Sequence, residues 1–164
     1  MTSLLFVLVL LGPAAHPAPA GPFDSLAFLI GSFEGAGKSQ MGPYEETLTG
    51  QLEVGKSILT VRSQSTAVGT TVFEDLRVFS HDASTRKLRA RQFAFGGVAT
   101  YDVTIADDRQ SVTLTEAAFE GERRPPWRYV YTDIKTDGFS YRVENKRGDE
   151  WSLYVSGSLK RKKD

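Results

Sequence analysis

The sequence predicts an all-β protein: a single ten-stranded antiparallel up-and-down barrel with a short N-terminal helical plug. Three observations support this fold class. Apolar and polar residues alternate with period 2 over most of residues 32–161, the pattern of strands that bury one face. The alternating runs are separated by short turns containing Gly, Pro, Asp or Asn, and short turns join antiparallel neighbours. Sequential strands with no long helix to cover them hide their edges by closing into a barrel.

The expected elements follow one another closely along the chain. A helix of one or two turns is expected over residues 23–29, where Asp24 or Ser25 is placed to cap it. The apolar residues of this segment would close one barrel end: Phe23, Leu26 and Phe28 to Ile30. The strands are expected at residues 32–41, 44–54, 57–67, 70–80, 87–95, 98–106, 110–119, 127–136, 138–146 and 150–161.

Residues 1–20 have the pattern of a signal peptide. An unbroken apolar run, Leu4 to Leu11, is followed by Gly12-Pro13 and then by Ala18-Pro19-Ala20, an A-x-A cleavage pattern. The apolar run is far shorter than the ~20 residues of a membrane-spanning helix. We therefore expect cleavage after Ala20 and one mature domain, residues 21–164, secreted or periplasmic and without a membrane span.

Composition argues against several function classes. The chain has 20 Lys and Arg against 20 Asp and Glu, so it lacks the surplus positive charge that nucleic-acid binding requires. It has no Cys, and His81 is the single His after residue 20, which excludes thiol nucleophiles, disulfides and Cys/His zinc sites. Residues 28–39, FLIGSFEGAGKS, look like a phosphate-binding loop. However, Ser32 stands where that motif requires Gly, and a strand pattern follows in place of a helix.

The same stretch carries a family resemblance. Residues 29–37, LIGSFEGAG, follow a short apolar turn and resemble the L-x-G-x-W-x-G-x-G start of calycin-type barrels. The likeness is to the nitrobindin-like and fatty-acid-binding-protein-like group, in a bacterial branch of unknown function. Tyr44-x-Glu46, Val72-x-Glu74 and the final LYVSGSLKR agree with it in order. The resemblance spans residues 24–161 and implies a ten-stranded barrel, but Phe33 stands where the group usually has Trp.

The nitrobindin resemblance also implies a haem held by a His on the last strand. In this chain the corresponding position falls on Leu153 or Tyr154, and neither is His. A tyrosinate can ligate ferric haem, so Tyr154 would be the iron ligand if haem were bound. Alternation places Leu153 and Val155 on the core face and Tyr154 outside. No cofactor is therefore expected, and haem is kept as an alternative.

Interior polar residues are the candidate binding groups. Phasing each strand by its apolar residues places three carboxylates inside the barrel, together with Trp127 and several tyrosines. Buried carboxylates must be paired, hydrogen-bonded or protonated. They either fix the strands through such partners or serve as polar anchors of a small-molecule pocket. The predicted ligand-binding residues are Tyr44, Glu46, Glu74, Tyr101, Glu116, Tyr129, Tyr131 and Tyr141, with no metal ligand.

These residues predict a protein that binds a small apolar or amphipathic molecule inside the barrel. Three alternatives remain open: a haem protein that handles NO or peroxynitrite, an enzyme whose inward carboxylates converge, and a filled barrel that acts as an envelope interaction module. Interior arginines would indicate an anionic lipid, as in fatty-acid-binding barrels. Our phasing, however, places Arg77 outside with Phe73 and Phe79, and places Arg62, Arg89 and Arg91 outside as well.

Overall fold

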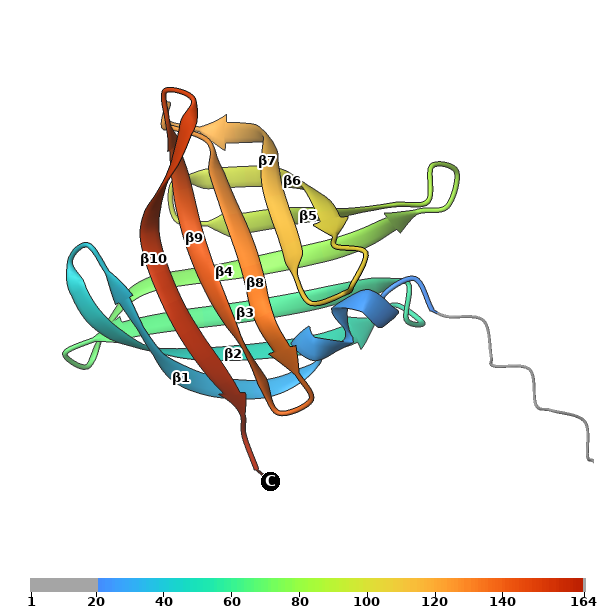
Figure 1. Cartoon of the computed structure of the whole chain (residues 1–164), viewed down its shortest axis with the longest axis horizontal. Helices are drawn as coiled ribbons and strands as arrows, with labels where there is room; N and C mark the ends of the chain where they lie inside the picture. Colours follow the sequence, from blue (N-terminus) through green and yellow to red (C-terminus); the bar gives the residue numbers. More distant parts are fainter. Residues whose placement is uncertain (1–20, 164) are drawn as a thin grey trace, which may run out of the picture.

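A computed structural model describes residues 21–163, in which ten antiparallel strands close into one barrel (Figure 1). The predicted signal peptide, residues 1–20, lies outside the described residues. The elements are η1 (Asp24–Leu29), β1 (Gly31–Ser39), β2 (Gly42–Glu53), β3 (Ile58–Ala67), β4 (Thr70–Asp82), β5 (Lys87–Ala94), β6 (Gly97–Ile105), β7 (Val112–Gly121), β8 (Trp127–Lys135), β9 (Gly138–Arg147) and β10 (Glu150–Arg161).

Each strand pairs with its neighbours in sequence, and β1 closes the barrel against β10 with Gly37 opposite Gly157. This arrangement confirms the predicted fold class. The predicted strand boundaries are also close to the observed ones: the largest differences are two residues, as at β7, expected at 110–119 and found at 112–121. Turn residues located the strands well because each turn contains a residue that breaks the alternation.

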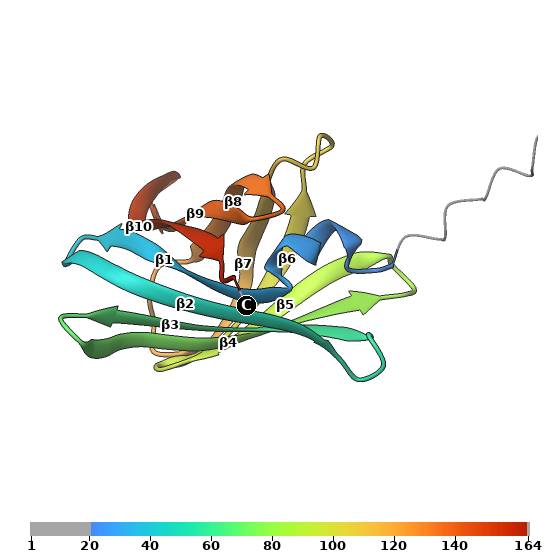
Figure 2. The same cartoon turned by 90° about the horizontal axis from the view of Figure 1, so that it is seen from below.

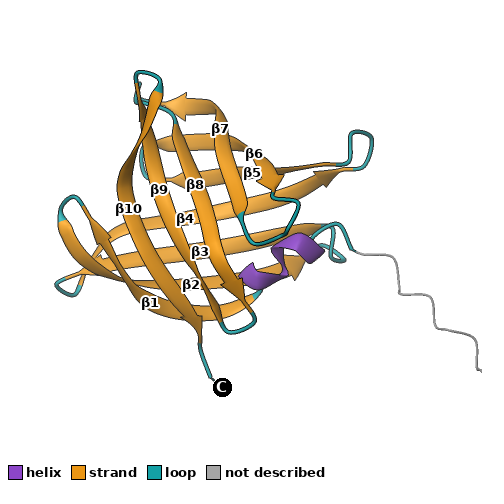
Figure 3. Ribbon diagram, viewed as in Figure 1, coloured by secondary structure: helices purple, strands orange, loops and turns teal. Residues whose placement is uncertain are grey.

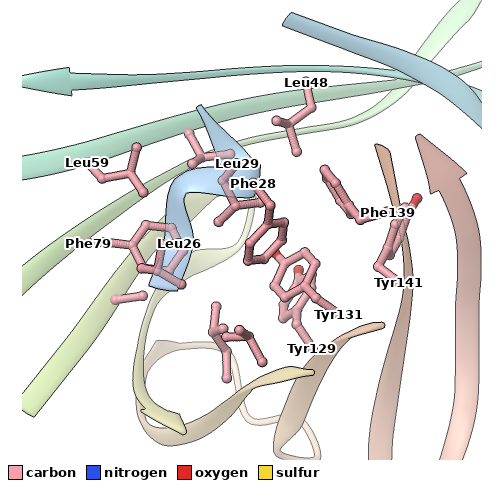
Figure 4. Close-up of a cluster of buried hydrophobic side chains, with 14 of the residues drawn as sticks. Leu26, Phe28, Leu29, Leu48, Leu59, Phe79, Tyr129, Tyr131, Phe139 and Tyr141 are labelled. Atoms are coloured by element: carbon pink, nitrogen blue, oxygen red, sulfur yellow. The ribbon is translucent and has the colours of Figure 1, made fainter. Parts of the chain in front are cut away.

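The N-terminal segment closes one end of the barrel, as predicted (Figures 2 and 3). It is a six-residue 3-10 helix in which Leu26 and Leu29 are fully buried. Phe28 packs edge to face against Tyr131 and Phe139, with ring centroids 5.5 and 5.2 Å apart (Figure 4). The opposite end of the barrel carries the β1–β2 and β3–β4 turns, seen at the left of Figure 2.

The predicted cap of this helix is wrong. Phe23 occupies the N-cap position and no side chain caps the helix. The carboxylate of Asp24 instead accepts a hydrogen bond from the backbone N–H of Gly21, at 2.9 Å. Burial of the apolar side chains, rather than a capping bond, therefore holds this short segment in place.

The inward face of β4 is opposite to the one predicted. Asp75, Arg77 and Phe79 are buried, whereas Glu74 is exposed and Val72 is 51% exposed. The strand has apolar residues on both faces, so alternation alone does not define its phase. The true phase buries two charged side chains, which the pattern of apolar residues predicts to lie outside.

The alternation of β10 is broken by a bulge at Tyr154. Pairing with β9 shifts between Leu153 and Val155, which leaves Tyr154 without a partner residue in the register. A bulge of this kind brings consecutive side chains to one face. Leu153 is therefore 55% exposed, and both Tyr154 and Val155 border the barrel interior. The predictions that Leu153 lies inside and Tyr154 outside are both wrong.

Candidate functional site

A cavity of about 270 Å³ lies inside the barrel, which we call the barrel pocket. The residues at its mouth, Met41, Pro43, Ala67, Trp127 and Tyr154, come from the end of the barrel opposite η1. Its inner wall includes Leu48, Phe139 and Leu159 and is mainly apolar and aromatic. The barrel is therefore not filled by its own side chains.

The structure brings most, but not all, of the predicted binding residues to this pocket. Those that line it are Tyr44, Glu46, Tyr129, Tyr131 and Tyr141. Tyr101 is buried, but its hydroxyl donates a hydrogen bond to Gln92 at 2.8 Å, outside the pocket lining. Glu74 faces outward, so its predicted inward orientation is wrong. The part that the lining residues play in ligand binding stays a prediction.

Two tyrosines that line the pocket meet above a pair of glycines. Gly37 of β1 and Gly157 of β10 are register partners, and each is flanked on its other side by a tyrosine, Tyr44 and Tyr141 respectively. Without Cβ atoms below them, the two rings lean over the glycines from opposite sides. Their hydroxyl oxygens meet at 2.5 Å (Tyr141 in Figure 4).

This tyrosine pair holds Glu46, which is 7% exposed. The Tyr141 hydroxyl donates a hydrogen bond to Oε2 of Glu46, so Tyr44 donates to the oxygen of Tyr141. Burial raises the pKa of Glu46 to about 7, against the opposing effects of the Tyr141 hydrogen bond and the positive charge of Arg77. Burial also raises the pKa of Tyr44 to about 12, so Tyr44 remains a donor at neutral pH.

The raised pKa of Glu46 predicts that stability falls with rising pH. Its ordinary value is 4.5 and its folded value about 7, so between these values the folded state binds more protons than the unfolded state. We expect the free energy of unfolding of wild type to fall by about 2.5 kcal/mol relative to Glu46→Gln between pH 5 and pH 8. Urea denaturation of both proteins at the two pH values measures this change. A difference that is independent of pH would contradict it.

A second polar cluster surrounds Arg77, which is 3% exposed and lines the pocket. Its Nη1 donates to the hydroxyl of Tyr131 and its Nη2 to Oγ of Ser63, the latter at 3.2 Å. Nε lies 3.0 Å from a carboxylate oxygen of Asp75, although it makes no hydrogen bond of good geometry. The guanidinium is thus charge-neutralised within the wall. Burial acts to lower the pKa of Arg77, but the nearby carboxylate of Asp75 and the surrounding groups outweigh it and raise this pKa above the ordinary value.

Asp75 extends this cluster away from the pocket. Its carboxylate also accepts hydrogen bonds from Ser63 and from the side-chain amide of Gln92. Gln92 in turn donates to the hydroxyl of Tyr129 at 2.7 Å and accepts from Tyr101. Asp75, Gln92 and Ser63 were not predicted as interior residues. The spacing Asp75-x-Arg77 puts both charges on the same face of the strand, and this spacing is the sequence signal for the buried pair.

Glu116 points inward but does not reach the pocket. A shift in the β6–β7 register, between Thr100 and Tyr101, lies opposite it. Its carboxylate is 2.8 Å from Nη1 of Arg124 and accepts a hydrogen bond from the backbone N–H of Trp127 at 3.3 Å. Glu116 therefore fastens the β7–β8 loop. Of the three predicted inward carboxylates only Glu46 borders the pocket, so Glu46, Glu74 and Glu116 do not converge there for acid–base chemistry.

Tyr154 and Trp127 form part of the pocket mouth. Their ring centroids are 5.1 Å apart.

Among residues 21–163 no group of His, Cys, Asp and Glu side chains is arranged to hold a metal ion. Within the same residues, no helix has the length and apolar character needed to cross a bilayer.

Comparisons with known proteins find likenesses among solved structures. No protein-family model and no curated protein matches the chain. Among solved structures, one that it resembles is a de novo designed fluorescence-activating β-barrel, with 13% identity and a TM-score of 0.39 over 85% of this chain and 98% of that chain. At this identity and TM-score the likeness says nothing about what this chain binds, and the calycin and nitrobindin resemblance gains no support from it.

Proposed function

We propose that this protein binds a small, mostly apolar molecule in the barrel pocket. The observation that carries the proposal is an open cavity with apolar and aromatic walls and a few inward polar groups, which is the usual anatomy of a small-molecule site. Its volume of about 270 Å³ is close to the lower end of the ~300–1,000 Å³ range of such sites. A compact ligand is therefore favoured over a long lipid.

The other candidate functions have less support. A filled barrel that acts as an interaction module leaves the cavity unexplained. An enzyme that uses converging carboxylates would need Glu74 and Glu116 beside Glu46, and Glu74 faces outward. A haem would need an axial ligand. The phenols of Tyr44, Tyr131 and Tyr141 are engaged in interior hydrogen bonds, and the ring of Tyr154 packs against Trp127. We expect haemin titration to give no Soret band that depends on Tyr154, with Tyr154→Phe as the comparison.

We also propose that the domain is exported after cleavage near Ala20, on the pattern of residues 1–20. Native mass spectrometry of the protein isolated from its own envelope fraction tests both proposals. The mass of the chain gives the cleavage site. Added mass that is lost on denaturation reports a retained ligand.

A large side chain at the pocket mouth is expected to block binding. Ala67 lines the mouth and is half-buried, so Ala67→Trp places an indole across the opening. We expect the apparent affinity for Nile red, measured by the increase in its fluorescence on binding, to fall at least tenfold. The reason is that a ligand can enter only by displacing the indole ring. The matched control is Ala36→Trp, on the exposed outer face of β1. Equal binding by both variants would place the dye outside the barrel pocket.

A further inference from the structure

The positive charge in the pocket wall is already balanced. Arg77 is buried against Asp75, and the two side chains are 4% and 0% exposed. Its Nη groups donate to Tyr131 and Ser63. A ligand carboxylate brought to Arg77 would displace one of these bonds and meet the charge of Asp75 at close range, without water to screen it. The pocket is therefore a poor site for an anion.

Glu46 has acceptor capacity left over. Its Oε2 accepts the hydrogen bond from Tyr141, whereas no side-chain bond within residues 21–163 engages Oε1. Glu46 lines the pocket, and neither of its carboxylate oxygens is both fully buried and without a hydrogen-bond partner. An ionised carboxylate can accept about four hydrogen bonds, so a donor that arrives in the pocket finds an open acceptor.

The walls beside Glu46 suit a cation as well. Tyr44 and Tyr141, which are linked to Glu46 by hydrogen bonds, line the pocket, and aromatic faces attract ammonium groups through the ring quadrupole. With Arg77 and Asp75 cancelling, the sum of side-chain charges at the pocket is zero when Glu46 is protonated and −1 when it is ionised. The local charge is thus never positive.

From these contacts we infer that the pocket selects an apolar molecule whose polar end is an amine, bound as its ammonium ion by Glu46, rather than a fatty acid. The ammonium donates to Oε1 of Glu46 while the hydrogen bond from Tyr141 to Oε2 is kept. The apolar remainder of the ligand lies against Leu48, Val143 and Leu159. This inference rests on the proposed binding function and adds the chemical class of the ligand.

Three probes with the same chain length and different polar ends test the inference: octylamine, octanol and octanoate, measured by titration calorimetry at pH 8. The proteins are wild type, Glu46→Gln and Glu74→Gln. Glu74→Gln is a matched control because it removes an equal charge from the outer face of β4. For wild type we expect octylamine to bind about tenfold more tightly than octanol, the effect of one charge-assisted hydrogen bond, and octanoate to bind most weakly.

The variants separate the possible outcomes. Glu46→Gln should bring the affinity for octylamine down to that for octanol, whereas Glu74→Gln should behave as wild type. If octanol binds, and octanoate binds as tightly as octylamine or more tightly, the amine inference is overturned and the pocket function stands. Failure of all three probes, in a folded protein by circular dichroism, would count against the proposed function itself.

The pH dependence gives a second readout. Glu46 is faced by Tyr44 of β2, Tyr141 of β9, and Asp75 and Arg77 of β4. Burial raises the pKa of Glu46 to about 7, and the pKa values of Tyr44, Tyr141 and Arg77 are all raised above their ordinary values, away from neutrality. An alkylammonium stays charged from pH 6 to pH 8. The affinity for octylamine should therefore rise over this range in wild type and stay constant in Glu46→Gln. An equal rise in both proteins would contradict the assignment of Glu46.

Discussion

Gly37→Ala is expected to lower the free energy of unfolding by about 3 kcal/mol, at the upper end of the cost of overpacking. A Cβ at Gly37 would lie 2.3 Å from the ring and hydroxyl of Tyr44 and 2.7 Å from the backbone oxygen of Ser156. The ring has little freedom to retreat, because its hydroxyl is held 2.5 Å from that of Tyr141. Urea denaturation measures the loss.

A double-mutant cycle tests this explanation. If the clash with the ring causes most of the loss, Gly37→Ala should cost much less in a Tyr44→Leu background than in wild type. Ala36→Val adds carbon atoms to the exposed face of the same strand and should have little effect. Strictly additive effects of Gly37→Ala and Tyr44→Leu would show that the loss arises elsewhere, for example at Ser156.

Asp75→Ala is expected to lower the free energy of unfolding by about 3–5 kcal/mol, because it leaves the buried charge of Arg77 without compensation. The double variant Asp75→Ala with Arg77→Met should be more stable than Asp75→Ala alone, since it removes the remaining buried charge. Thermal and urea denaturation measure both variants.

An exposed ion pair provides the control for this second prediction. Asp102 lies 3.7 Å from Arg89 on the outer surface, where the two side chains are 63% and 60% exposed. Asp102→Ala should change the free energy of unfolding by less than about 1 kcal/mol. If Asp75→Ala were as mild as Asp102→Ala, the interior pair would not contribute to the stability of the barrel.

Much of the pocket wall could be predicted from strands whose apolar residues occupy one face only. In β2 the buried residues Tyr44, Glu46 and Leu48 alternate with exposed ones, so the inward direction of Glu46 follows from its apolar neighbour. The inward direction of Tyr141 on β9 was predicted for the same reason. For these strands a one-residue slip would bury a row of polar side chains, which is strongly unfavourable.

The rest of the site could not be predicted by alternation. On β4 both faces carry apolar residues, and the inward direction of Arg77 depends on Asp75, Ser63 and Tyr131, which come from three strands. On β10 a single bulge moves Tyr154 from the outside to the pocket mouth. No local pattern signals a bulge of this kind, because it reflects how two twisted strands fit together.

By itself, the sequence determined the number of strands, their order, the closed architecture and the helical plug, since these follow from period-2 alternation and from residues that favour turns. Only the tertiary structure decided that the barrel is hollow, that Glu46 is held by two tyrosines above Gly37 and Gly157, and that Arg77 is neutralised in the wall. The physical reason is that turn and strand preferences act between neighbours in the chain. Cavity volume and the pairing of buried charges depend on side chains that meet only after the barrel closes.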